Sequence, residues 1–230
     1  MASVNHIRFR PLSAVKRSIL KPGPRRREIR FGLLKGLNLR VDFQGQAQLY
    51  FGLYETETFA FCRAAAARAQ WMVDIGAGTG ELALYFMKIN GPDTVLAFEP
   101  SPGEREIFTE NLLANGWGGD DASISGSPVG TGEGCQALDR MGLDLTKRGF
   151  VKIDVDGAEM DVLESGPELL RSGMADFLVE THSRDLEDRC VALFEANGYR
   201  TDIIPNAWWR VVLPERRPVE HNRWLSAVRG

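Results

Sequence analysis

The sequence predicts an α/β fold, with a mainly parallel sheet of about seven strands, helices on both faces and an antiparallel hairpin at one edge. Two observations lead to this prediction. From residue 71 onward, short apolar runs alternate with segments of helical composition, as in parallel sheets whose strands are joined by helices. Beyond residue 199, strand-like runs follow one another without a helix, so the last pairing must be antiparallel.

The individual elements follow from local patterns. Near alternation of apolar and polar residues from Leu37 to Phe43 predicts a short hairpin or edge strand. Helical composition predicts helices at about 57–69, 81–90, 103–115, 159–166, 167–173 and 184–198. Apolar runs predict strands at 71–75, 94–99, 122–125, 150–155, 175–181, 199–204, 208–214 and 223–228. The last two strands are expected to pair with each other.

Length and composition favour one soluble domain, since 230 residues with 43% hydrophobic content are enough for one α/β core. No run of 18 apolar residues predicts a membrane-spanning helix, and the first 20 residues lack the pattern of a signal peptide. We therefore expect a cytoplasmic protein. The three cysteines lie far apart without CxxC spacing, which argues against a zinc site or a disulfide framework.

Charge divides the chain into a basic N-terminal arm, residues 1–40, and an acidic domain, residues 41–230. The arm has eleven basic residues and one acidic residue, whereas the remainder has 17 basic and 30 acidic residues. The arm is either a solvated terminus or a segment that faces an anionic partner such as lipid, a phosphorylated substrate or RNA. Peripheral membrane contact through residues 1–30 is one such possibility, while nucleic acid is not the expected partner.

The stretch WMVDIGAGTGE, residues 71–81, predicts a nucleotide-binding turn between a strand and a helix. Its glycines at 76, 78 and 80 have GxGxG spacing, and Glu81 stands where the dinucleotide motif GxGxxG has its third glycine. A carboxylate in the first helical turn repels a pyrophosphate. It suits a cationic ligand such as S-adenosylmethionine, whose sulfonium and amino groups Asp74 and Glu81 can attract.

Glu99 supplies the second part of this signal. It ends the strand at 94–99 and lies 19 residues after Gly80, where an acid accepts both ribose hydroxyls of a bound nucleoside. Two alternatives stay open. The glycines can serve close packing of helix and strand, or the turn can bind a nicotinamide cofactor.

The stretch FVKIDVDGAEMDVLESG, residues 150–166, is the more specific motif. A strand delivers Asp154 to its carboxyl end, and Asp156, Gly157 and Glu159 form the turn into the next helix. These carboxylates can orient an attacking hydroxyl or hold the amino end of the donor. Alternatively, Asp156 and Glu159 cap the helix.

With these motifs the sequence resembles the FkbM family of S-adenosylmethionine-dependent methyltransferases. The resemblance covers roughly residues 45–230 and rests on DIGAGTG, FEPSP, KIDVDGAE and VLESG, with further matches at Glu55 and in the ETH run at 180–182. Gly78 replaces an asparagine and Asp156 a glutamate of the family pattern. The resemblance implies a class I methyltransferase fold and methyl transfer to a hydroxyl, commonly on a sugar or a polyketide-like product. With it, the predicted donor-binding residues are Glu55, Asp74, Gly76, Ala77, Gly78, Gly80, Glu81, Glu99, Pro100 and Asp154.

The acceptor hydroxyl must lose a proton, and His182 is the preferred base because it follows a strand on the expected cleft side. Asp154 is the second choice, and a structural role for His182 stays open. No metal is predicted, although Asp154, Glu180 and His182 are also able to converge on a divalent cation. Four tryptophans are core or hairpin residues, or stack on a sugar: Trp117, Trp208, Trp209 and Trp224.

The predicted function is S-adenosylmethionine-dependent O-methylation of a saccharide or related small metabolite. Two rivals are a nucleic-acid methyltransferase guided by the basic arm and a non-catalytic protein that keeps the fold. The acidic body and the lack of an NPPY-like base-flipping loop disfavour the first rival.

Overall fold

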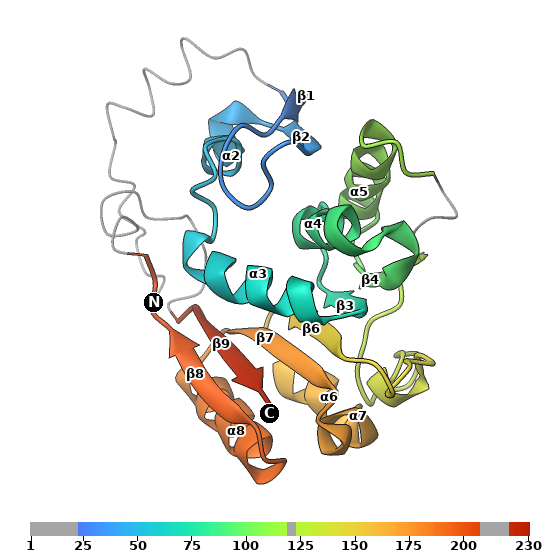
Figure 1. The fold of residues 1–230 in the computed structure, drawn as a ribbon, viewed down its shortest axis with the longest axis vertical. Coiled ribbons are helices and arrows are strands. Elements are labelled where there is room, and N and C mark those ends of the chain that lie inside the picture. The colour runs from blue at the N-terminus through green and yellow to red at the C-terminus, as the bar shows by residue number, and fades with distance from the viewer. Residues whose placement is uncertain (1–22, 119–122, 208–220) are drawn as a thin grey trace, which may run out of the picture.

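The protein is described by a computed structural model that covers residues 23–118, 123–207 and 221–230 (Figure 1). Within this part of the chain, seven strands form one sheet in the order β5-β4-β3-β6-β7-β9-β8. The strands are β3 (Trp71–Ile75), β4 (Val95–Phe98), β5 (Ser123–Ser125), β6 (Gly149–Ile153), β7 (Ala175–Thr181), β8 (Arg200–Ile204) and β9 (Arg223–Val228). The five strands from β5 to β7 pair in parallel, and β9 is antiparallel to both of its neighbours. The predicted mixed sheet is confirmed.

The antiparallel edge differs from the predicted hairpin in its pairing. β9 lies between β7 and β8 and hydrogen-bonds to both, and the expected partner strand at 208–214 lies outside the described residues. Its sequence explains the position, because Trp224, Leu225 and Ala227 are all buried. A strand that is apolar on both faces gains more from an interior place in the sheet than from its edge.

Helices cover both faces of the sheet (Figure 1). One hydrophobic core includes residues of α3 (Phe59–Arg68), α4 (Glu81–Asn90) and α5 (Pro102–Ala114). The other core includes α6 (Glu159–Glu164), α7 (Pro167–Ser172) and α8 (Arg184–Ala196). Alternate residues of each central strand belong to opposite cores, as with Met72 and Val73 in β3. Short 3₁₀ helices lie at η1 (Thr56–Thr58), η2 (Pro92–Thr94) and η3 (Leu138–Arg140).

The strand predicted at Leu37 to Phe43 is present in a separate two-stranded antiparallel sheet, and its partner lies in the basic arm, where no strand was predicted. This sheet consists of β1 (Arg25–Glu28) and β2 (Asn38–Val41). The backbone N–H groups of Asn38 and Arg40 donate to the side chains of Asn115 (2.9 Å) and Asn111 (2.7 Å), which ties the hairpin to α5.

The hairpin leads into α2 (Phe43–Tyr50), a helix with a kink at Gln46 that the sequence patterns did not indicate. Residues 1–22 of the basic arm lie outside the described part of the chain. Within the described residues, the structure contains no helix with the length and apolar character needed to cross a membrane.

Candidate active site

A cavity of about 110 Å³ lies beside the carboxyl ends of β3 and β6. Its wall includes seven of the ten predicted donor-binding residues: Glu55, Asp74, Gly76, Ala77, Gly78, Glu81 and Asp154. The wall also includes residues of the hairpin region, the segment before α3, α3 itself, α4, β6, β7 and β9: Leu33, Leu34, Tyr54, Thr58, Phe59, Cys62, Leu82, Lys152, Leu178 and Trp224. Of these ten, the sequence patterns had indicated only Trp224, as a core, hairpin or sugar-stacking residue. Gly80, Glu99, Pro100 and His182 are not wall residues of this cavity.

The turn after β3 makes a close backbone contact with the end of β6. Gly76 has φ +71°, and a Cβ built on it would lie 1.8 Å from the carbonyl oxygen of Asp154. Gly80 has φ +88°, and its Cβ would lie 2.2 Å from the Phe108 ring of α5. The first glycine therefore lets two strand ends meet at the cavity, whereas the third serves the close packing that the sequence left open as an alternative.

Glu99 directly follows β4 and is already held by backbone groups. Its Oε2 accepts a hydrogen bond from the N–H of Gly78 (2.9 Å), and its Oε1 accepts one from the N–H of Ser101 (2.8 Å). Each carboxylate oxygen has two lone pairs, so one acceptor site remains on each. Glu99 thus orients the glycine turn, and its contact with a ribose stays a prediction.

Lys152 is a buried residue of this site that the sequence reasoning missed. Its Nζ lies 3.4 Å from Asp74 Oδ1 and 3.4 Å from Asp154 Oδ2, and it donates a hydrogen bond to the carbonyl of Gly76. Burial lowers the pKa of Lys152, but Asp74 and Asp154 outweigh this effect and raise it above its usual value. The available signal was a lysine in the apolar strand run FVKID, which has no place in a core unless it is paired.

Two carboxylates in the cavity wall, those of Asp74 and Glu81, lack the solvation that their charged forms need, which favours a cationic ligand. Burial raises the pKa of Asp74, and the charge of Lys152 offsets this only in part. Burial also raises the pKa of Glu81, against a hydrogen bond from the Thr79 hydroxyl. A raised carboxyl pKa means that the charged form lacks solvation, which a nearby positive group supplies.

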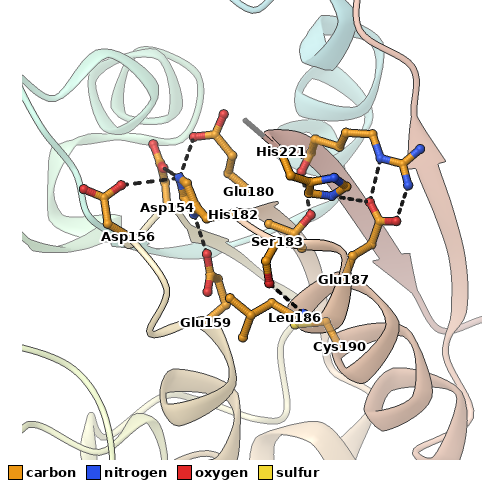
Figure 2. Close-up of polar contacts among 12 residues, drawn as sticks. Asp154, Asp156, Glu159, Glu180, His182, Ser183, Leu186, Glu187, Cys190 and His221 are labelled. Atoms are coloured by element: carbon orange, nitrogen blue, oxygen red, sulfur yellow. Dashed lines mark hydrogen bonds and ion pairs between the residues drawn. The ribbon is translucent and has the colours of Figure 1, made fainter. Parts of the chain in front are cut away.

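His182, directly after β7, lies at the centre of a group of carboxylates (Figure 2). Its Nδ1 is hydrogen-bonded to the fully buried carboxylate of Glu159 from α6. Its Nε2 faces three other carboxylates, with distances of 3.4 Å to Asp156 Oδ1, 3.7 Å to Glu180 Oε2 and 3.9 Å to Asp154 Oδ1. Glu159 was expected either in the cleft or as a helix cap, and here it positions the imidazole.

The hydrogen bond to Glu159 is the largest cause of a raised pKa at His182, opposed by burial and supported by the charges of Glu159, Asp154 and Asp156. A raised pKa increases the protonated fraction at neutral pH, and an imidazolium cannot accept a proton. The structure therefore brings the predicted base to the predicted edge of the sheet in an electrostatic setting that opposes direct base catalysis. The base assignments of His182 and Asp154 stay predictions.

Of the four tryptophans that the sequence assigned to the core, to a hairpin or to sugar stacking, Trp224 is buried and forms part of the cavity wall. Its indole Nε1 is buried and has no hydrogen-bond partner among the described residues. Trp117 is partly buried against the core that includes α5, in agreement with a packing role. Trp208 and Trp209 lie outside the described residues.

The strand order, the antiparallel strand β9 next to the edge of the sheet and the helices on both faces define a class I methyltransferase fold. Methyltransferase FkbM from Methylobacillus flagellatus has a similar structure, with a TM-score of 0.53 and 14% identity over 80% of this chain and 65% of that one. The tRNA (uracil-54, C5)-methyltransferase of Pyrococcus abyssi, solved with S-adenosyl-L-homocysteine, has a TM-score of 0.55 and 14% identity over 91% of this chain and 45% of that one.

At this level of identity, these likenesses show the fold alone. This chain spans less than two thirds of the length of either protein. No family model matches the sequence, and no curated protein matches it either.

Proposed function

We propose that the protein transfers a methyl group from S-adenosylmethionine to a hydroxyl of a saccharide or related small metabolite. The observation that carries this proposal is one cavity whose wall combines the glycine turn, the buried Asp74, the half-buried Glu81 and Asp154. The similar structures support it, since both are named as methyltransferases and one contains S-adenosyl-L-homocysteine.

We assign the groups of the donor to residues in the cavity wall and in the loop after β4. Glu99 receives the ribose hydroxyls on its remaining lone pairs, while Asp74 and Glu81 attract the amino and sulfonium groups. Glu55 and Ala77 lie in the same wall. Pro100 follows Glu99, and its carbonyl accepts a hydrogen bond from Arg105 (2.8 Å), which fixes the loop after β4.

In the reaction, the bond between the sulfonium and the methyl carbon breaks, and its electron pair stays on sulfur. The acceptor oxygen forms the new bond to carbon and loses its proton. Holding the oxygen in line with the methyl group supplies much of the rate. Asp154 and His182 are the residues that we propose for activation of the hydroxyl, since Glu159 directs Nε2 of His182 toward Asp154.

Calorimetry with S-adenosylmethionine, followed by radiolabelled methyl transfer to a panel of glycans and small hydroxyl compounds, tests this function. Glu99→Ala should weaken donor binding at least tenfold, and Glu106→Ala, an exposed acid on α5, should leave it unchanged. A wild-type chain that binds no donor would rule out the proposal. Donor binding without transfer to any acceptor would favour a non-catalytic protein.

Nucleic acid is the second candidate acceptor, and the exposed β1 strand with Arg25, Arg26 and Arg27 favours it. A salt-dependent shift of RNA in a gel, lost on deletion of residues 1–30, would support this candidate. Its absence, together with methylation of a glycan, would exclude it. The proposal also includes a methyltransferase domain at residues 41–230, to whose cavity Leu33 and Leu34 of the arm contribute. It further includes peripheral membrane contact through residues 1–30 and a cytoplasmic location.

A further inference from the structure

We propose that Asp154, Glu180 and His182 bind a divalent cation at the edge of the cavity. One atom of each residue is of a type that binds cations, and these three atoms all lie within 4.8 Å of one another. The register of the sheet explains why they meet. Ile153 of β6 pairs with Val179 of β7, so that Asp154 and Glu180 follow side by side, and His182 lies two residues further along.

The setting of His182 is the first argument. Histidines that bind metals usually donate their second ring N–H to a carboxylate, which fixes the tautomer and the orientation of the ring. Glu159 fills this role at Nδ1 (Figure 2). In the neutral tautomer with its proton on Nδ1, Nε2 has its lone pair on the side where Asp154 and Glu180 lie, and a bound cation favours this tautomer.

The distances are the second argument. Two atoms bound to one cation at about 2.1–2.4 Å lie roughly 3–4.5 Å apart. Nε2 of His182 is 3.9 Å from Asp154 Oδ1 and 3.7 Å from Glu180 Oε2, which is within this interval and too long for hydrogen bonds. The nearest carboxylate oxygen to Nε2 is Asp156 Oδ1, at 3.4 Å, and it belongs to a side chain that is 94% exposed. Nε2, on a side chain that is 7% exposed, therefore faces carboxylate oxygens of three residues, and a cation bound among them would offset their mutual repulsion.

Burial distinguishes the inner side of the site from the side that a ligand can reach. The side chain of Glu180 is 1% exposed, whereas that of Asp154 is 27% exposed and forms part of the cavity wall. The other oxygen of Asp154 faces Lys152, which holds the carboxylate in place. Three protein ligands leave coordination positions open on the cavity side, and one imidazole with two carboxylates suits an ion such as Mn²⁺.

The consequence for catalysis rests on the proposed function. An acceptor oxygen bound at an open position has a lowered pKa. Its proton leaves to solvent water, the oxygen attacks the methyl carbon, and the electron pair of the broken bond stays on sulfur. In this arrangement His182 is a ligand and Glu159 a positioning residue, which removes the need for a neutral imidazole base. Acceptors with two neighbouring oxygens gain the most, because they fill two positions.

Mn²⁺ binding to the EDTA-treated full chain tests the site without donor or acceptor. In electron paramagnetic resonance, the signal of free Mn²⁺ should fall until one ion is bound per chain. His182→Ala and Asp154→Asn should each weaken binding at least tenfold. Glu159→Gln, which keeps all three ligands but removes the carboxylate that positions His182, should weaken it by about 10- to 100-fold. The matched control is Asp185→Asn, an acid with 79% side-chain exposure near the same strand end, which should bind as the wild type does.

Circular dichroism of each variant separates lost ligands from lost folding, and Mn²⁺ should raise the melting temperature of the wild type but not of folded His182→Ala. Absence of saturable binding in the wild type, or equal affinity in folded His182→Ala, would overturn the proposal. Calorimetry with S-adenosylmethionine on the same preparations keeps the two proposals apart. Donor binding without Mn²⁺ binding removes only the cation site, and the reverse removes only the proposed function.

Discussion

The two halves of the proposed site, one for the donor and one for the acceptor, are built in different ways. On the donor side, at the ends of β3 and β4, backbone groups position the carboxylate of Glu99, which accepts hydrogen bonds from the N–H groups of Gly78 and Ser101. On the acceptor side, at the ends of β6 and β7, side chains position one another, with His182 among four carboxylates. The donor side therefore depends on backbone conformation, and the acceptor side depends on charge and side-chain identity.

This difference predicts different responses to substitution. A backbone-built site fails when the chain cannot keep its conformation, so changes there affect stability and donor affinity together. A site built from side chains loses its chemistry when one partner is removed, while the fold persists through the two cores. The following variants test the distinction, beginning with the largest expected effect.

Gly76→Ala should be the most damaging change. Its Cβ would meet the Asp154 carbonyl at a residue with φ +71°, so we expect the free energy of unfolding to fall by more than ~3 kcal/mol, with loss of donor binding. Gly78→Ala is the matched control, because φ is +53° there but the Cβ meets nothing within 4 Å; it should cost ~1 kcal/mol. Urea unfolding measures both. Equal losses would show that the strand contact is unimportant.

His182→Ala should lower kcat by about 10²-fold and leave the dissociation constant of S-adenosylmethionine unchanged. The reason is position, since His182 lies among the acceptor-side carboxylates and is not a wall residue of the donor cavity. Steady-state kinetics and calorimetry together check this. If donor affinity falls as much as turnover, the two halves are not separate.

Trp224→Phe should affect the acceptor without harming the fold. Its buried Nε1 has no hydrogen-bond partner among the described residues, so removal of this N–H should leave the free energy of unfolding unchanged or slightly higher. Trp224 lies in the cavity wall and pairs across the sheet with Glu180 of the acceptor side. If its N–H donates to the acceptor, the KM for the acceptor should rise about fivefold in the variant, the value of one hydrogen bond. An unaltered KM would reduce Trp224 to a packing residue.

The smallest expected effect concerns Cys62, which is buried in the cavity wall on the donor side, because its reactivity shows how well solvent is excluded there. Burial is the main cause that raises the pKa of its thiol to about 12. At pH 8 this thiol should react with iodoacetamide far more slowly than the half-buried Cys135, and its reactivity should increase as the pH approaches 12. In the unfolded chain the thiol ionises at lower pH, so this residue lowers stability as pH rises above about 8.5. Mass spectrometry of labelled peptides measures the rates, and equal labelling at pH 8 would contradict a closed wall.

The sequence by itself determined the sheet, most helices, the glycine turn and the acid at the end of β4. These features depend on neighbouring residues, because periodicity, glycine spacing and the offset from Gly80 to Glu99 are all local properties. The same local reasoning failed at Phe43–Tyr50, where a helix follows the hairpin, and at β9, whose partners depend on the whole sheet.

Only the tertiary structure decided how the chemistry-bearing side chains meet. Glu159 holds His182 from 23 residues away, and Lys152 reaches the Gly76 carbonyl from 76 residues away. The sequence contained all four residues, but periodicity says only which face of an element each one occupies. Their contacts follow from the order and register of the strands, because adjacent parallel strands deliver their ends to one edge, where charges are close enough to interact strongly.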